Sequence, residues 1–326
     1  MRLTRRHLMS FAGGAVAATA VRSVRAAEPA WPTRPVKLIL TLGPGSGADI
    51  GSRLIADRLQ QRWGQPVVVE NRPGGDGIVA INAFVGAHDD HVLLFTPTSS
   101  FTAHPFLHEN LPYKSSDLVP ITRFSNTIVA FSVPASLNVA SIAELVALAR
   151  AQPGKLNWAG VTGALDFLLA GWLQQEKLEV TKIAYKNPVD AANDLAEGRV
   201  QIYESAYAIA RPQIMNGKIR PLAVTNTVHP KEPDLPTVQE AGFPGLTVDG
   251  LVGFFGPSGI SRELRDKITA DVRAVADDTI RERLSTTGQL LNVGGPEEFA
   301  KSIEQQTTQV ATFAKQLGIS PLPQNN

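Results

Sequence analysis

The sequence contains no cysteine at any of its 326 positions. A disulfide framework is therefore excluded, as is any chemistry that needs a thiolate as nucleophile or metal ligand. There is also no residue near the N-terminus that could carry a thioether-linked lipid anchor. The hydrophobic fraction of 43% is ordinary and allows a large apolar core, and chains of this length usually divide into two domains.

The chain also lacks a strong excess of one charge. Its formal net charge is +1. Five of the 31 basic residues and none of the acidic residues precede position 27, so a chain cut after Ala26 would have 26 basic against 30 acidic residues, a net charge of −4. Such a balance gives no reason to expect a nucleic acid or another polyanion as partner.

No hydrophobic run is long enough to span a membrane, because the apolar segment at 11–21 is well short of the roughly 20 residues required. Basic residues precede this segment, and Val24-Arg25-Ala26 follows it with the residue types that signal peptidase needs. The pattern predicts an export signal over residues 1–26 and a protein of the periplasm, soluble after cleavage; a membrane anchor is the alternative. Arg5-Arg6 favours the twin-arginine route, although ordinary secretory signals also begin with basic residues.

Motifs for catalysis are scarce. The sequence contains no Gly-x-Ser-x-Gly elbow and no Gly-Lys-Ser or Gly-Lys-Thr loop. The spacing His88-x-x-His91 is compatible with a metal site, but a solvated turn around Asp89-Asp90 is favoured. We therefore expect no catalytic residue, no cofactor and no metal.

Short apolar runs alternate with amphipathic segments from residue 36 onward, which predicts α/β units with parallel strands covered by helices. The first set has predicted strands at 36–42, 66–70 and 92–95 and helices at 49–63 and 78–85. The second has strands at 156–159, 181–185, 200–203 and 222–224 and helices at 142–151, 167–176, 189–197 and 208–216. The segment 262–317 is helical in pattern, without a strand, and should pack on the first lobe.

Two successive α/β sets predict two lobes. The apolar runs at 128–133 and 251–255 lie between the sets and are the expected crossings, so the second lobe would be inserted into the first. The predicted domains are 27–131 plus 250–326 for lobe 1 and 132–249 for lobe 2. The crossing strands near Phe131 and Phe254 would act as a hinge.

A glycine-rich loop lies between the first predicted strand and helix: Gly43-Pro44-Gly45-Ser46-Gly47-Ala48-Asp49. Glycines allow close backbone approach, and a helix N-terminus offers free N–H groups, so the loop suits a carboxylate or phosphate. Asp49 is expected to cap the helix. One alternative is a dinucleotide fingerprint with Glu70 at the ribose, although the glycine spacing departs from G-x-G-x-x-G; another is an ordinary turn.

Short motifs run in order from Trp31 to about Ile319. The most specific is a Gln-Pro-Val-Val-Val strand followed by Glu70-Asn71-Arg72-Pro73-Gly74. The others include Trp31-Pro32-Thr33-Arg34-Pro35, Leu111-Pro112-Tyr113, Pro153-Gly154-Lys155, Gly217-Lys218-Ile219-Arg220-Pro221 and Leu235-Pro236-Thr237-Val238-Gln239-Glu240. Together they resemble the Bug or TctC family, extracytoplasmic solute receptors of tripartite tricarboxylate transporters.

The resemblance implies a type II-like periplasmic-binding-protein (Venus-flytrap) fold, in which two α/β lobes joined by crossing strands close over one organic acid. It also implies that the glycine loop and a hydroxyl-rich loop, Thr96-Pro97-Thr98-Ser99-Ser100, hold a ligand carboxylate. Neutral donors in a closing cleft can do so without a buried counter-charge. The residues implied are Gly45, Ser46, Gly47, Ala48, Thr98, Ser99 and Ser100; for the last three, a plain polar loop is the alternative.

The chain departs from the family pattern at the opposite wall. Thr162-Gly163-Ala164-Leu165-Asp166-Phe167-Leu168 replaces a common Gly-Asn-Gly-Thr-Ser-Ser-His stretch, and Glu204-Ser205-Ala206 replaces Phe-Asp-Asn. Asp166 and Glu204 would repel a second ligand carboxylate. We expect Thr162, Gly163, Asp166 and Ser205 to select a distal group that is apolar, aromatic, hydroxylated or cationic. The alternative is that Asp166 caps its helix and Glu204 faces solvent.

The expected partners are therefore a small carboxylate-bearing ligand and the integral-membrane permease subunits of the transporter, with the protein itself a monomer. A ligand sensor that reports to a membrane two-component kinase is an alternative with the same fold. An exported nucleotide-dependent oxidoreductase is the third possibility, and it depends on the glycine loop alone.

Overall fold

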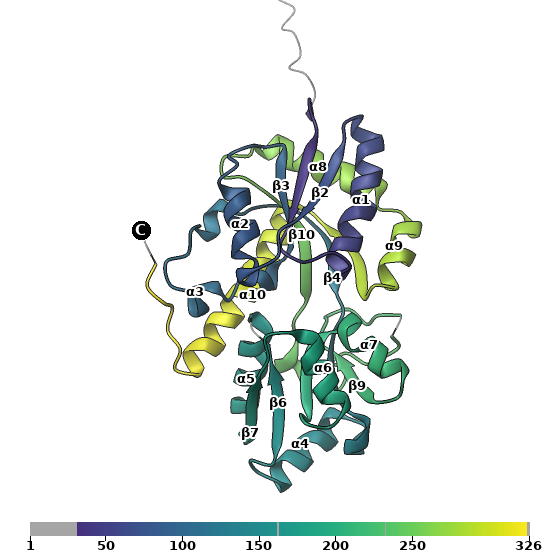
Figure 1. The fold of residues 1–326 in the computed structure, drawn as a ribbon, viewed down its shortest axis with the longest axis vertical. Helices are drawn as coiled ribbons and strands as arrows, with labels where there is room; N and C mark the ends of the chain where they lie inside the picture. The colour runs from purple at the N-terminus through teal and green to yellow at the C-terminus, as the bar shows by residue number, and fades with distance from the viewer. Residues whose placement is uncertain (1–30, 162, 232, 325–326) are drawn as a thin grey trace, which may run out of the picture. The chain divides into compact units, whose positions relative to one another are not determined.

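Two β-sheets, each flanked by helices, form the framework of the protein (Figure 1). The computed structural model describes residues 31–161, 163–231 and 233–324. The described residues from position 32 onward belong to one compact unit. The predicted export signal over residues 1–26 lies outside the described residues.

The first sheet contains six strands: β1 (Val36–Leu40), β2 (Val67–Asn71), β3 (Val92–Pro97), β4 (Val119–Thr127), β10 (Gly250–Gly256) and β11 (Gln289–Gly294). Their order across the sheet is β11-β4-β10-β3-β1-β2. β1 pairs in parallel with β2 and β3, whereas β10 is antiparallel to both β3 and β4. The apolar run VKLIL makes β1 a central strand, buried except at Lys37.

The second sheet contains five strands: β5 (Val129–Pro134), β6 (Leu156–Gly160), β7 (Val180–Ala184), β8 (Ile202–Ala206) and β9 (Ile219–Val224). Their order is β7-β6-β8-β5-β9. β6 pairs in parallel with β7 and β8, and β5 is antiparallel to β8 and β9. We refer to the parts built on the first and second sheets as the first and second lobes.

The α-helices around the sheets are α1 (Gly47–Trp63), α2 (Ile78–Val85), α3 (His104–Leu107), α4 (Ile142–Ala151), α5 (Ala164–Gln175), α6 (Pro188–Ala196), α7 (Tyr207–Met215), α8 (Arg262–Val275), α9 (Asp278–Ser285) and α10 (Pro296–Gln316). Short 3-10 turns are η1 (Gly75–Gly77), η2 (Thr98–Ser100), η3 (Ser115–Asp117), η4 (Ala135–Leu137) and η5 (Pro244–Leu246). Serine hydroxyls cap α1 at Ser46 and α4 at Ser141, each accepting the N–H three residues further on.

Aromatic rings fill both cores. Phe95, Phe124 and Phe254 of the first sheet are fully buried, and the rings of Phe95 and Phe254 meet edge to face with centroids 4.8 Å apart. In the second lobe, Trp172 of α5 packs edge to face on Phe131 of β5, with centroids 5.9 Å apart. Each sheet therefore has its own apolar core.

The chain passes between the sheets at Ile128 and again in the segment 225–249. Ile128 is the single residue between β4 and β5. Its N–H donates to the Gly288 carbonyl of the first lobe, and its carbonyl accepts from Tyr207 N–H of the second, both at 2.8 Å. One residue thus has one main-chain hydrogen bond to each lobe.

Asn226 ties the two passages together. Its Nδ2 donates to the Thr127 carbonyl at 2.8 Å, and its Oδ1 accepts from Val129 N–H at 2.9 Å. Asn226 is completely buried, and its bond to Val129 N–H is shielded from water. The first passage is therefore held on either side of Ile128 by a side chain of the second passage.

The helices and strands of the two predicted α/β sets are all present, and helices α2 and α4 have the bounds that the periodicity predicted. The sheets are mixed, whereas the alternation predicted parallel strands, because β4, β5, β10 and β11 pair antiparallel. The prediction that 262–317 contains no strand is wrong: β11 is an edge strand buried only at its two ends, so its sequence has neither alternation nor an apolar run. Helices α8, α9 and α10 pack on the first lobe as expected, and α10 also contacts α5.

The predicted boundary at residue 131 falls inside β5, which pairs with strands of the second sheet. Phe131 and Phe254, expected near the hinge, are buried strand residues, and the passages themselves lie at Ile128 and 225–249. The division into 27–131 plus 250–326 and 132–249 stays a prediction about which parts move together.

Candidate functional site

The glycine loop after β1 forms the N-terminus of α1. Ser46 Oγ accepts the Asp49 N–H at 3.2 Å, and Gly45 N–H donates to Asp49 Oδ2 at 2.9 Å. Helix geometry leaves the N–H groups of Gly47 and Ala48, the first two residues of α1, without an intrahelical acceptor. Two of the predicted donors are thus available to a ligand, the Ser46 hydroxyl proton is a third, and Gly45 is already bonded within the loop.

Gly47 lies where no side chain would fit. A Cβ at this position would be 2.8 Å from Gln289 Nε2 and 3.0 Å from the Thr287 carbonyl oxygen. Gln289 is buried and bonds to Thr127 Oγ1 and Ser125 Oγ of β4. The start of α1 therefore lies directly against Thr287 and the side chain of Gln289, which is in turn bonded to β4.

The expectation that Asp49 caps α1 is wrong: the N-cap is Ser46, and Asp49 lies three residues further on, in the first turn. Its carboxylate accepts hydrogen bonds from Arg53 Nε at 3.1 Å and from Asn71 Nδ2 at 2.9 Å, in addition to Gly45 N–H. Burial acts to raise the pKa of the Asp49 carboxyl, but hydrogen bonds from Arg53, Gly45 and Asn71 outweigh it and hold that pKa below its ordinary value. The negative charge is thus compensated before any anion arrives.

Glu70, the candidate ribose ligand of the dinucleotide alternative, is occupied by cations. Its carboxylate is 2.9 Å from Lys37 Nζ and bonds to Arg72 Nε. These two hydrogen bonds, that of Lys37 first, lower the pKa of Glu70. A carboxylate paired in this way is a poor acceptor for ribose hydroxyls, which argues against the dinucleotide interpretation.

The hydroxyl-rich loop forms the 3-10 turn η2 directly after β3. β1 and β3 are neighbours, with Leu40 opposite Phe95, so the loops that follow them meet at the same sheet edge. Thr41 links them, since its Oγ1 lies 2.5 Å from Thr96 Oγ1 and 3.4 Å from Ser100 Oγ. The two loops expected to bind a carboxylate are therefore adjacent.

The three hydroxyl residues of η2 differ in their surroundings. Thr98 is completely buried and donates its hydroxyl proton to Gln306 Oε1 of α10, at 2.5 Å. Ser99 and Ser100 are partly exposed. The structure thus directs the Thr98 hydroxyl into the protein and leaves the two serines at the surface of the loop.

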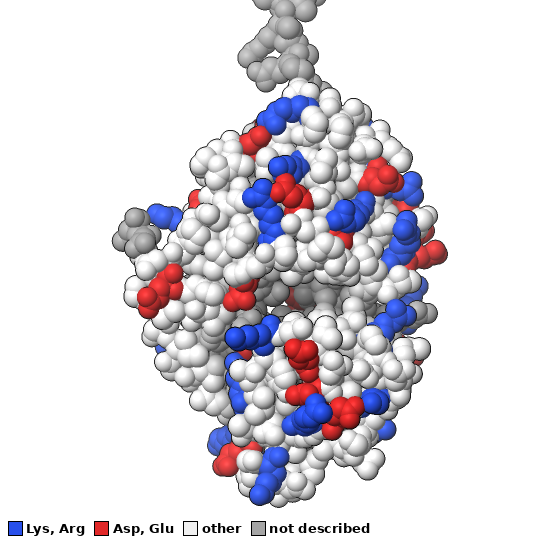
Figure 2. Space-filling view, viewed as in Figure 1, with Lys and Arg blue, Asp and Glu red and all other residues white. Residues whose placement is uncertain are grey.

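Gly163 brings the second lobe against this loop. Its φ of 86° is in the left-handed region, and a Cβ there would lie 3.4 Å from the Ser99 carbonyl oxygen. Gly163 directly precedes α5, as expected for the distal wall. Thr162, predicted beside it, lies outside the described residues. The surface in Figure 2 is hollowed between the two lobes, and acidic and basic side chains are interspersed on this face.

Asp166 is held within its own lobe. Its Oδ1 accepts the Val161 N–H at 2.9 Å, and its Oδ2 is 2.6 Å from Lys182 Nζ. Lys182 in turn lies 5.2 Å from the ring centre of Trp158. Asp166 thus bonds to a residue before α5 and not to a free N–H of the helix, which has no side-chain cap at its N-cap Gly163, so the capping alternative is wrong. The charge of Asp166 is balanced by Lys182.

Phe167, the other notable residue of this stretch, points to the first lobe. It is buried and packs on Phe106 of α3, with ring centroids 5.8 Å apart. Leu165 packs beside Leu168, Val248 and Phe313. These apolar side chains contribute to the contact between lobes.

Glu204 does not face solvent. It is 5% exposed, and neither carboxylate oxygen has a hydrogen-bond partner among the described residues. Burial, and secondarily the charge of Asp166, raises the pKa of Glu204 to about 8. Ser205, the next residue of β8, is also buried, and its Oγ lies 3.5 Å from the Ala206 carbonyl oxygen.

The His88-x-x-His91 segment is a turn. His88 has a φ of 47°, and His91 Nε2 accepts the Thr33 N–H at 3.1 Å while Nδ1 lies 2.6 Å from Asp90 Oδ1. Asp89, Asp90 and His91 are close enough together to surround an ion. Both ring nitrogens of His91 are bonded within the protein, however, so its ring offers no lone pair to a metal.

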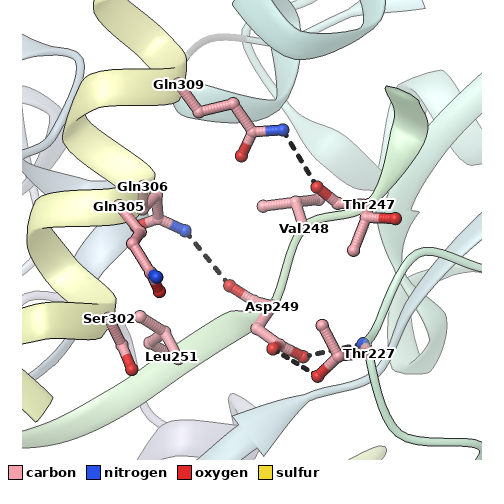
Figure 3. A pocket seen from close by; sticks show the side chains of 9 residues that line it. All are labelled: Thr227, Thr247, Val248, Asp249, Leu251, Ser302, Gln305, Gln306 and Gln309. Carbon is pink, nitrogen blue, oxygen red and sulfur yellow. Dashed lines mark hydrogen bonds between the residues drawn. The ribbon is translucent and has the colours of Figure 1, made fainter. Parts of the chain in front are cut away.

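Sequence reasoning missed a group of polar residues around α10 and the second passage. A cavity of about 180 Å³ separates them, as Figure 3 shows. Its lining is Thr227, Thr247, Val248, Asp249, Leu251, Ser302, Gln305, Gln306 and Gln309. The one available signal was Gln306 itself, a polar residue at a core-facing position between Phe299 and Val310 of an otherwise apolar helical stripe.

The fold and the paired loops define the class: a two-lobed extracytoplasmic solute-binding protein. A protein of R. palustris solved with adipate matches with a TM-score of 0.75 and 28% identity, over 90% of this chain and 100% of that chain. The periplasmic binding protein BugD matches with a TM-score of 0.71 and 25% identity, over 90% and 100% of the two chains.

The particular family follows from the sequence comparison. The profile of the TctC family, described as tripartite tricarboxylate transporter family receptor, matches residues 52–319, and this chain belongs to that family. A relative from a Pseudomonas species, the UPF0065 protein in the tcbD-tcbE intergenic region, is 30% identical over 284 residues, 85% of this chain and 84% of the relative. The expected family, fold class and receptor function are confirmed. No helix in the described part of the chain is long and apolar enough to cross a membrane.

Proposed function

We propose that this receptor holds one carboxylate of a small organic acid between the N-terminus of α1 and the turn η2. The observation that supports this most is that both loops follow neighbouring parallel strands, are joined through Thr41, and contain no lysine or arginine. The donors would be the N–H groups of Gly47 and Ala48 and the hydroxyls of Ser46, Ser99 and Ser100. Gly45 and Thr98 would support the loops, since their donors are already used.

We infer that the far end of the ligand carries no second carboxylate. Gly163 and α5 would form that wall, with Asp166 and Ser205 behind it. Lys182 balances the charge of Asp166, and residues 162–168 contribute no basic side chain that could pair with a second carboxylate. The adipate in the R. palustris protein is a dicarboxylate, so this chain would differ from that relative in ligand preference.

We infer a cellular role that the receptor family supports. The chain would be exported, cleaved after Ala26 and act as a monomer in the periplasm, where it delivers its ligand to integral-membrane permease subunits. We infer that it carries out no catalytic step. This inference is supported by the receptor family and by the absence from the sequence of a nucleophile elbow.

A panel of thermal-shift measurements tests the ligand class. Monocarboxylates with apolar, aromatic, hydroxylated or amino-bearing ends are compared with malate, adipate and citrate. A ligand at 100 times its Kd should stabilise the protein by about 2.7 kcal/mol. Stabilisation by citrate or adipate and by no monocarboxylate would overturn the distal-end proposal, and mass spectrometry of any molecule released on denaturation gives an independent answer.

A further inference from the structure

Gln306 connects the ligand-binding loop to the passage between the lobes. It lies on α10 and is 6% exposed. Its Oε1 accepts the hydroxyl proton of Thr98 in η2 at 2.5 Å. Its Nε2 donates to the Asp249 carbonyl at 3.1 Å, as Figure 3 shows. The oxygen of this buried amide is thus bonded to η2, and its nitrogen is bonded to the second passage.

Asp249 extends this connection. Its carboxylate accepts hydrogen bonds from Thr227 N–H at 3.1 Å and Thr227 Oγ1 at 2.7 Å, and Asn226 Nδ2 lies 3.5 Å away. Asn226 then bonds on either side of Ile128 in the first passage. A series of hydrogen bonds therefore runs from η2 through Gln306 to both passages.

A cavity beside Gln306 makes its hydrogen bond to Asp249 important for the position of the second passage relative to α10. The cavity of about 180 Å³ between α10 and the segment from Thr247 to Leu251 is large enough for several water molecules. Val248 of this segment shares an apolar cluster with Phe313 of α10, and Leu251 shares another with Phe299. Beside these apolar contacts, two hydrogen bonds tie the main chain of the segment to α10: that of Gln306, and that of Gln309, whose Nε2 donates to the Thr247 carbonyl at 3.0 Å.

We propose that Gln306 is a positioning residue that makes the conformation of η2 and the geometry of the two interlobe passages depend on each other. A ligand that orders η2 would then favour one arrangement of the passages, and so of the lobes. The inference rests on the proposed function in taking η2 as part of the carboxylate site. It goes beyond that proposal because Gln306 is not one of the proposed ligand donors.

Hydrogen exchange of the ligand-free protein tests the connection directly. The N–H groups of Phe101 and Thr102, which donate to the Thr98 carbonyl, report on η2; those of Val129 and Thr227 report on the passages. Gln306→Leu should speed exchange about five- to tenfold in both groups, the factor that corresponds to one lost net hydrogen bond. Thr98→Val removes the hydroxyl that bonds to Gln306 and changes nothing in the passages, yet it should also speed exchange at Thr227. Thr98→Ser keeps that hydroxyl donor, so exchange at Thr227 should stay at the wild-type rate.

Gln309→Leu is the matched control. It removes a hydrogen bond from the same helix to the same segment, but it has no contact with η2. Its effect should stay near Thr247 and leave Phe101 and Thr102 at wild-type rates. Unchanged exchange at Val129 and Thr227 in Thr98→Val, or equal effects of Gln306→Leu and Gln309→Leu on η2, would overturn the proposal.

The two proposals can fail separately. Hydrogen exchange is measured without ligand, so it tests the role of Gln306 whether or not a ligand is found. If malate, adipate and the monocarboxylates all left the wild-type melting temperature unchanged, that result would count against the proposed function alone. If a compound does bind, Gln306→Leu should weaken it by about three- to tenfold and Gln309→Leu should not. Equal affinities in the two variants would leave Gln306 with a structural role only, against the proposal.

Discussion

Glu204 has a carboxyl group that is buried without a hydrogen-bond partner among the described residues, whereas glutamate side chains ordinarily lie in water. A buried carboxyl group without a hydrogen-bond partner is costly when charged, so it tends to hold its proton instead. Glu204 lies on β8 opposite Phe131, and Asp166 contributes a nearby negative charge. We therefore expect a neutral carboxylic acid at this position at neutral pH, able to donate a hydrogen bond as well as accept one.

This environment gives a prediction about stability and pH. Burial raises the pKa of Glu204 from 4.5 to about 8, so the native state binds a proton that the unfolded state releases between these values. The free energy of unfolding should therefore fall as the pH rises through that window. Glu204→Gln should be more stable than wild type by roughly 2–4 kcal/mol at pH 8 and differ little at pH 5, as measured by urea unfolding.

Glu109→Gln is the control for this prediction, because Glu109 is exposed. As a substitution at an exposed position, it should change the free energy of unfolding by no more than about 0.5 kcal/mol. If wild type and Glu204→Gln showed the same pH dependence, the Glu204 carboxyl would have to be ionised in the folded protein and to have gained water or a cation as partner.

At the scale of single elements, α1 and α4 start in the same way but in different places. Each begins with a serine whose hydroxyl accepts the N–H three residues further on, at 3.2 Å for Ser46 and 3.1 Å for Ser141. Only α1 has its first turn at the proposed carboxylate site. Comparing the two serines therefore separates the contribution of a serine cap to helix stability from its contribution to ligand binding.

Ser46→Ala and Ser141→Ala should each lower the free energy of unfolding by about 1 kcal/mol, the usual cost of losing a serine cap. Only Ser46→Ala should also weaken ligand binding, by about tenfold, because the ligand loses a hydroxyl donor. Urea unfolding gives the first quantity, and calorimetry with the compound that stabilises the wild type most gives the second. Equal affinities for both variants would limit Ser46 to capping.

At the scale of the whole molecule, the passages at Ile128 and 225–249 are narrow relative to the two sheets that they join. The first passage consists of one residue, Ile128, which is hydrogen-bonded to both lobes. The side chain of Asn226, in the second passage, is bonded to residues on either side of it. Few φ and ψ angles would have to change for the lobes to move relative to each other. The contacts of α10 with both lobes, including Phe313 against Gly171, limit which movements are possible.

We expect ligand binding to reduce the radius of gyration, because a ligand that touches both walls favours the closed arrangement. Small-angle X-ray scattering with and without the most stabilising compound measures this. A compound from the same panel that gives no thermal shift is the control and should leave the profile unchanged. Superimposable profiles with the stabilising compound would contradict closure.

The helices α2 and α4 were predicted with their observed bounds because glycines flank α2 at positions 77 and 86, and Ser141 caps the start of α4. β11 was missed because an edge strand is buried at few positions. The antiparallel pairings of β4 and β10 were missed because they join residues more than 100 positions apart, and apolar runs alone do not indicate a partner or a direction.

The site was predictable to a similar extent. The glycine loop at Ser46 could be located because glycines before a helix have a local physical meaning, whereas the loop at Ser99 was implied by the resemblance to the family. The sequence could not show which hydroxyls of these loops are free to bind a ligand. Thr98 and Ser99 are neighbouring hydroxyl residues, yet the hydroxyl proton of Thr98 is donated to Gln306, 208 residues further along the chain. The pairing of Asp166 with Lys182 likewise depends on β7 lying beside β6.

The sequence by itself determined the family, the two α/β sets and the neutral, glycine- and hydroxyl-rich character of the proposed carboxylate site, since these depend on residue type and short-range order. Only the tertiary structure decided which donors point outward, which charges are balanced and that Gln306 stands between the site and the passages. The reason is physical: the hydrogen-bond partner and burial of a side chain are set by segments that the fold brings together from distant parts of the chain.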